Sequence, residues 1–181
     1  HGIESAILRY RVLPAGGIDD AMDDLQAAAE HLRKTREGPV AAIGFSAGGH
    51  LVASLGLRAG AAGASQPLDC QLLIYPGLVI HRTDWFWNTL DDWGRPTGAI
   101  PEKAEALLAQ NAPMLGGEGF GAPPSFVCAA SDDTDCPCEM HTDPYVAALR
   151  ARRIPVTYVR RKFGGHGFGL TGGWTGACLA Y

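Results

Sequence analysis

The stretch PVAAIGFSAGGHL, residues 39–51, sets an apolar run, a serine between two glycines and a helix-forming segment in direct succession. The apolar residues predict a strand at 39–45, and the residues after the serine predict a helix at 47–57. A strand that turns at once into a helix strains the backbone of Ser46, and only small flanking residues avoid clashes there. The pattern G-x-S-x-G over Gly44–Gly48 therefore predicts a sharp strand-to-helix turn with the serine at its tip.

Further elements alternate along the chain around this turn. Apolar and β-branched runs predict strands at 5–12, 70–75, 125–129 and 155–160. Helical spacing of apolar residues predicts helices at 18–34, 101–111 and 143–152. Strands that alternate with helices are typical of a parallel sheet with helices on both faces. We therefore expect an α/β fold with a mostly parallel sheet of about five strands, in one domain over residues 1–181.

The composition is that of a folded domain with a hydrophobic core. Hydrophobic residues make up 46% of the 181 residues and charged residues 19%, so a core can form. The net charge of −4 argues against a nucleic-acid or anionic-membrane surface. No apolar run reaches the roughly 18 residues of a membrane-spanning helix. The five cysteines are irregularly spaced, which favours neither a disulfide framework nor a zinc site, and we expect no metal.

A serine hydroxyl becomes a nucleophile when a base accepts its proton and a third group orients that base. At a turn of this kind the three residues follow in the order serine, acid, histidine. His166 comes after the last predicted strand in a glycine-rich loop, which favours it as the base for Ser46. His50 lies one turn past the serine and is interpreted as a packing or supporting residue. Two further histidines have no supporting pattern: His81 and His141.

The acid is expected soon after the strand at 125–129, where three aspartates cluster: Asp132, Asp133 and Asp135. Spacing alone does not separate these three. The amide of Ala47, at the start of the helix after the serine, is expected to donate a hydrogen bond to a developing oxyanion, helped by the helix dipole.

Three motifs in this order resemble those of the α/β-hydrolase esterases and lipases, most of all the acetyl-xylan-esterase and hormone-sensitive-lipase-like branch. They are GFSAGGHL at 44–51 with LRYRVLP at 8–14 before it, PPSFVCAASDDTDCP at 123–137, and GGHGFGL at 164–170. In this family the acid is usually followed by two residues and then a Val-Pro pair. Cys136-Pro137 takes that place here, so the resemblance implies Asp133 as the acid, with Asp132 as the fallback. It also implies a structural role for Glu139 and no cofactor.

The chain departs from the family pattern at its start. Family members carry strands before the LRYRVLP-like strand, together with an HGGG-type loop that supplies a second oxyanion amide. His1-Gly2 is not that loop, because it lies too close to the strand at 5–12. One hypothesis is that this strand pairs with the strand at 39–45 and that Gly16-Gly17 replaces the loop, although a plain turn there is favoured. Missing strands would expose a sheet edge, which predicts a homo-oligomer.

A long aromatic stretch predicts a cap insertion at about 79–121. It holds Trp85, Phe86, Trp87 and Trp93, which either line an ester pocket or anchor a loop. Asp91 and Asp92 disfavour long acyl chains. The sequence therefore predicts a serine carboxylesterase acting on short-chain esters through an acyl-enzyme. The alternatives are a non-catalytic hydrolase-fold protein kept for binding or assembly, and a serine peptidase of the prolyl-oligopeptidase type.

Overall fold

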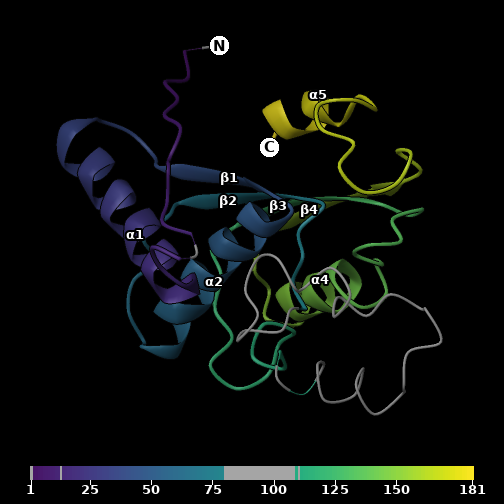
Figure 1. The fold of residues 1–181 in the computed structure, drawn as a ribbon, viewed down its shortest axis with the longest axis horizontal. Helices are drawn as coiled ribbons and strands as arrows, with labels where there is room; N and C mark the ends of the chain where they lie inside the picture. Colours follow the sequence, from purple (N-terminus) through teal and green to yellow (C-terminus); the bar gives the residue numbers. More distant parts are fainter. Residues whose placement is uncertain (1, 13, 80–108, 110) are drawn as a thin grey trace.

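The structure of the protein is a computed structural model, which describes residues 2–12, 14–79, 109 and 111–181. Four parallel strands form the sheet in the order β1-β2-β3-β4 (Figure 1). They are β1 (Ala41–Phe45), β2 (Cys70–Ile74), β3 (Ser125–Ala130) and β4 (Val156–Arg161). Phe45 pairs with Ile74, and Ile74 pairs with Cys128, so the carboxyl ends of the strands meet at one edge of the sheet.

Helices cover both faces of this sheet. They are α1 (Ile18–Thr35), α2 (Ala47–Ala61), α4 (Thr142–Ala151) and α5 (Trp174–Leu179). The first three share one buried cluster with Leu73 and Val127 of the sheet, whereas Trp174 of α5 packs on the opposite face with Ile74 and Phe126 (Figure 1). Neighbouring residues of a strand point to opposite faces, which is why Leu73 and Ile74 belong to different clusters.

The expected α/β class and the parallel sheet are confirmed, and so are most of the elements. The strands predicted at 39–45, 70–75, 125–129 and 155–160 form with ends shifted by at most two residues. The helices predicted at 18–34 and 143–152 shift by one residue, and the helix after the serine runs to Ala61 instead of residue 57. Helix α5 was not predicted.

The predicted strand at 5–12 is wrong, because this segment forms no strand. The backbone amide of Arg11 donates to the Asp24 carboxylate of α1 at 2.8 Å, and the guanidinium bonds Asp24 and Asp20. The segment is therefore attached to a helix through side chains, while Ile7 remains 96% exposed. A strand-like composition forms a strand only where a neighbouring strand completes the hydrogen-bond ladder. The pairing of 5–12 with β1 is wrong for the same reason.

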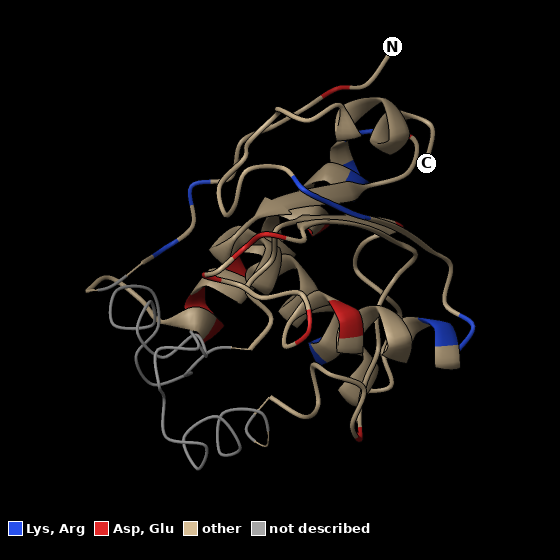
Figure 2. Cartoon of the chain, turned by 90° about the vertical axis from the view of Figure 1, so that its right-hand side faces the viewer, with Lys and Arg blue, Asp and Glu red and all other residues tan. Residues whose placement is uncertain are grey.

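Two other predictions fall largely outside the described residues: the helix at 101–111, and the cap at about 79–121 with its aromatic side chains. Within the described part, no helix combines the length and hydrophobicity needed to cross a membrane. Figure 2 shows lysines and arginines at separate places along the chain in that view. The predicted absence of nucleic-acid partners stays a prediction.

Candidate active site

Ser46 stands at the turn between β1 and α2 in a conformation that few residues other than glycine adopt. Its backbone angles are φ 50° and ψ −116°, and such a conformation costs about 1–3 kcal/mol. The Ser46 amide donates to the Ile74 carbonyl at 3.0 Å, which attaches the turn to the end of β2. The predicted sharp turn is therefore present, with the serine at its tip.

Gly44 is required because the start of α2 returns very close to the end of β1. A Cβ atom at Gly44 would lie 2.2 Å from the carbonyl oxygen of Gly48. A backbone oxygen cannot rotate away as a long side chain can. At Gly48 itself, a Cβ atom would meet no heavy atom within 4 Å. Of the two glycines in the G-x-S-x-G pattern, the first is thus the one that the backbone geometry demands.

His166 reaches the serine from the loop after β4. Its Nε2 atom lies 2.8 Å from Ser46 Oγ, and its Nδ1 atom lies 2.7 Å from Asp133 Oδ2. The flanking Gly165 and Gly167 have φ of 91° and 75°, which residues with a side chain rarely adopt. An ionised carboxylate only accepts hydrogen bonds, so Nδ1 carries the proton and Nε2 accepts from the Ser46 hydroxyl.

Asp133 lies just beyond β3 and is held as an anion. Its side chain is 1% exposed, whereas that of His166 is 18% exposed. Its Oδ1 atom accepts hydrogen bonds from the amides of Asp135 at 2.9 Å and Cys136 at 2.8 Å. Burial works to raise the pKa of Asp133, but the bond from His166 and these amides outweigh burial and leave the pKa below its usual value. A carboxylate in this state orients the imidazole and can stabilise its protonated form.

The structure thus brings together Ser46, His166 and Asp133, and it separates Asp133 from its neighbours. Asp132 instead accepts hydrogen bonds from the amides of Phe163 and Gly164, both at 3.2 Å, and so braces the loop that carries His166. Beyond these residues, Glu139 forms an ion pair with Arg160 of β4.

The other histidines lie elsewhere. His50 is fully buried, with Nδ1 2.9 Å from the carbonyl oxygen of Gly77. His141 is also fully buried, and its Nδ1 accepts from the amides of Leu78 and Val79 at 2.9 and 3.2 Å. His81 lies outside the described residues.

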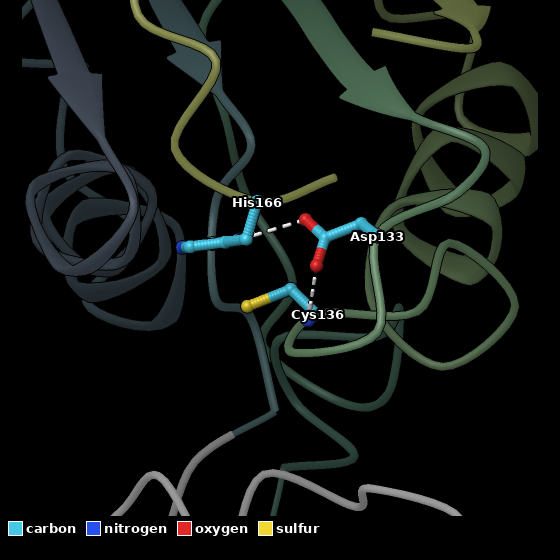
Figure 3. Close-up of side chains that lie close together, drawn as sticks. All are labelled: Asp133, Cys136 and His166. Atoms are coloured by element: carbon cyan, nitrogen blue, oxygen red, sulfur yellow. Dashed lines mark hydrogen bonds and ion pairs between the residues drawn. The ribbon is translucent and has the colours of Figure 1, made fainter. Parts of the chain in front are cut away.

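A cysteine beside the acid completes a set of three side chains with metal-ligating atoms. Atoms of Asp133, Cys136 and His166 lie within 4.8 Å of one another. In Figure 3, however, the backbone nitrogen of Cys136 faces the carboxylate, and the thiol points away from it. Burial raises the pKa of the Cys136 thiol well above its usual value, which disfavours the thiolate that a metal requires. Both oxygens of Asp133 are already bonded, so the set fits a hydrogen-bonded pair better than a metal centre.

The amides expected near an oxyanion divide into two cases. Ala47 is the first residue of α2, where amides have no carbonyl partner within the helix. Gly16 and Gly17 do not fit the hypothesis made for them, because their amides donate to Val12 O and to Asp20 Oδ2.

The position of the Gly16-Gly17 turn excludes it as well. Arg58 donates to the Asp19 carbonyl and the Asp23 carboxylate, which sets the start of α1 beside the last turn of α2. Arg58 is 11 residues beyond Ala47, roughly 16 Å along the helix axis. The plain turn is therefore the correct interpretation of Gly16-Gly17.

One residue of the site was not found from the sequence. Tyr75 follows β2, has φ 38°, and packs edge-on against the His166 ring with centroids 5.1 Å apart. Its ring also lies 4.6 Å from that of Phe168. Only its position could have indicated Tyr75 from the sequence. It is the last residue of the strand predicted at 70–75, and the other site residues also follow the carboxyl ends of strands.

Comparisons with known proteins show which fold family the chain belongs to. A family model described as the alpha/beta hydrolase fold matches residues 4–170. Among solved structures, the chain is similar to an acetyl ester-xyloside bifunctional hydrolase from Caldicellulosiruptor lactoaceticus, with 24% identity and a TM-score of 0.65. That match covers 94% of this chain and 67% of the other. A search of curated proteins found no match.

Two further solved structures share the fold at lower identity. One structure from an analysis of two fungal esterases from Rhizomucor miehei matches with 20% identity and a TM-score of 0.62, over 94% of this chain and 60% of that one. A puromycin-hydrolyzing peptidase from Mycobacterium tuberculosis matches with 19% identity and a TM-score of 0.55, over 81% of this chain and 22% of that one. The chain thus spans only part of the length of these proteins. The family match over most of its residues shows that the chain belongs to the α/β-hydrolase fold family.

Proposed function

We propose that the chain hydrolyses carboxylic esters through an acyl-enzyme formed on Ser46. The observation that carries this proposal is one continuous line of hydrogen bonds, 2.8 Å from Ser46 Oγ to His166 Nε2 and 2.7 Å from His166 Nδ1 to Asp133 Oδ2. A hydroxyl, an imidazole and a carboxylate in this order form the arrangement that activates serine in several unrelated enzyme folds.

In the proposed mechanism, Ser46 Oγ attacks the ester carbonyl carbon while His166 Nε2 accepts the hydroxyl proton. The tetrahedral intermediate collapses when His166 returns that proton to the leaving alcohol, and Ser46 keeps the acyl group. Water then attacks the acyl-enzyme with His166 again as the base, which releases the carboxylic acid and restores the serine. Asp133 remains an anion throughout and holds the imidazole in the required tautomer.

The amide of Ala47 is proposed to stabilise the oxyanion. An amide at the start of a helix presents its N–H together with the positive end of the helix dipole. The second donor that relatives supply from an HGGG-type loop is not assigned to any described residue. We expect measurable hydrolysis of acetate esters by residues 1–181.

Short-chain esters are the proposed substrates. The sequence at 79–121 is proposed to form a cap within a single domain, and Asp91 and Asp92 in it disfavour a long acyl chain. The name of the bifunctional hydrolase that shares the fold refers to an acetyl ester, a small acyl group.

A homo-oligomer is proposed as well. Because residues 5–12 form no strand, β1 and β4 are the edge strands of the described sheet. The unpaired backbone groups of an edge strand can pair with a second copy of the chain.

The test is labelling by a fluorophosphonate probe together with a substrate panel. The probe should label the wild-type chain and fail to label Ser46→Ala, since it reacts with an activated serine. Failure to label the wild type would favour a non-catalytic binding protein. A panel of nitrophenyl esters from acetate to decanoate, run beside peptide amides, should show the highest rates for short esters. Faster cleavage of the amides would favour the peptidase alternative.

A further inference from the structure

The segment after β2 crosses directly against the nucleophile turn. The amide of Gly77 donates a hydrogen bond of 3.3 Å to the carbonyl oxygen of Ser46. The same oxygen accepts the first helical bond of α2, from the amide of His50 at 3.1 Å. The carbonyl oxygen of Ser46 thus accepts hydrogen bonds from two segments, helix α2 and the segment after β2.

His50 holds the crossing segment in place. Its Nδ1 atom lies 2.9 Å from the carbonyl oxygen of Gly77. Because that oxygen only accepts, Nδ1 carries a proton and donates it. His50 is fully buried, and a hydrogen bond in such a place is costly to leave unmade. The bond therefore fixes the peptide that follows Gly77 relative to the first turn of α2.

The crossing segment is closely packed as well as hydrogen-bonded. A Cβ atom at Gly49 would lie 2.7 Å from Cβ of Pro76, so α2 and the segment meet with no room for a side chain. Tyr75, one residue earlier, presses its ring against His166. A shift of residues 75–77 would therefore displace both the carbonyl group of Ser46 and the imidazole of His166.

We propose that His50 is a positioning residue, which acts through the Gly77 carbonyl to hold the 75–77 crossing against Ser46 and His166. This inference rests on the proposed function, since it assigns His50 a part in serine chemistry. Misplacement of a reacting group by about 1 Å can lower a rate by about 100-fold. Because His50 touches neither reacting atom, its loss should act on the rate of the chemical step and leave substrate affinity nearly unchanged.

Two substitutions at His50 separate the hydrogen bond from the volume of the side chain. His50→Leu fills a similar volume and removes the donor. His50→Asn keeps a donor, because the amide nitrogen of asparagine can take the place of Nδ1. Leu55→Ala is the matched control, since Leu55 is also buried in α2 and its loss creates a cavity away from Ser46.

The measurements are kcat and KM for nitrophenyl acetate and the rate of fluorophosphonate labelling. Circular dichroism gives the folded fraction of each variant, and the rates are divided by the concentration of folded protein. For His50→Leu we expect kcat and the labelling rate to fall by about 10–100-fold, with KM unchanged within about threefold. His50→Asn should recover most of that loss, and Leu55→Ala should keep wild-type kcat after correction for folded fraction.

Three outcomes overturn the inference. Wild-type kcat in His50→Leu would show that the bond to Gly77 does not position the serine. An equal loss in His50→Leu and His50→Asn, or an equal loss in Leu55→Ala, would show a packing effect instead. In those cases the wild type still labels at Ser46, so the proposed function stands. Absence of labelling in the wild type overturns the proposed function and this inference together.

Discussion

His166 Nδ1 lies 2.7 Å from Asp133 Oδ2, although 33 residues separate the two in sequence. Asp133 follows β3 and His166 follows β4, and these two strands are parallel neighbours. Parallel strands end at the same edge of a sheet, so two short loops suffice to bring acid and imidazole together. This contact fixes the tautomer of His166 and, together with the amides of Asp135 and Cys136, keeps Asp133 ionised.

Asp133 and Asp132 are adjacent, yet their substitutions should have very different effects. Asp133→Asn keeps the size of the side chain but replaces the anion that orients His166, so kcat for an acetate ester should fall by about 10²–10⁴-fold. Asp132→Asn retains an oxygen that can accept a hydrogen bond from the amide of Phe163, so kcat should fall by less than about tenfold. Steady-state kinetics of both variants measures the difference. If Asp132→Asn were the more damaging change, the assignment of the acid would be wrong.

Asp133 should also make folding stability depend on pH in the acid range. Its pKa is below the ordinary value in the folded protein, so the unfolded chain binds this proton more readily. The stabilisation is therefore complete at neutral pH and is lost as the pH falls below about 4, the ordinary aspartate pKa, through the lower folded value.

Urea unfolding of the wild type and Asp133→Asn at pH 5 and pH 3 tests this dependence. We expect the free energy of unfolding of the wild type to fall more steeply between the two pH values. A difference between the two proteins that is as large at pH 3 as at pH 5 would contradict a lowered pKa at Asp133.

The two glycines of the G-x-S-x-G pattern should respond unequally to alanine. Gly44→Ala drives a Cβ atom into the backbone oxygen of Gly48, and we expect it to destabilise the fold by about 3 kcal/mol or more. Gly48→Ala meets open space inside a helix and should be neutral or stabilising by up to about 1 kcal/mol. Thermal unfolding of both variants checks the pair. Equal stabilities would refute the close approach of β1 and α2.

The sequence is most informative where one local pattern determines the geometry. The run PVAAIGFSAGGHL indicates the strand, the turn and the helix, because apolar strand residues pass directly into helix-forming residues at Ser46 and Gly44 leaves room for the returning backbone of Gly48. The bounds of α1 and α4 are predicted to within one residue by helical spacing. In contrast, composition alone does not separate Asp132 from Asp133, because two adjacent residues differ in role only through the direction that the turn after β3 gives each side chain.

Predictions fail where a second segment decides the outcome. The residues at 5–12 suit a strand, but Arg11 bonds α1 instead of a neighbouring strand. Gly16-Gly17 offers amides, but Asp20 of α1 and Val12 already accept them. The contacts of His50 and Tyr75 depend on where the segment after β2 crosses, and no pattern around either residue reports that crossing.

Whether Ser46 is the nucleophile of an esterase is decided by the rate of p-nitrophenyl acetate hydrolysis by the 181-residue chain beside Ser46→Ala. Both proteins are prepared in the same way and are compared at equal folded concentration, with the uncatalysed rate subtracted. We expect turnover by the wild type and a loss of about 10³-fold or more in Ser46→Ala. Equal rates for the two proteins would contradict this expectation.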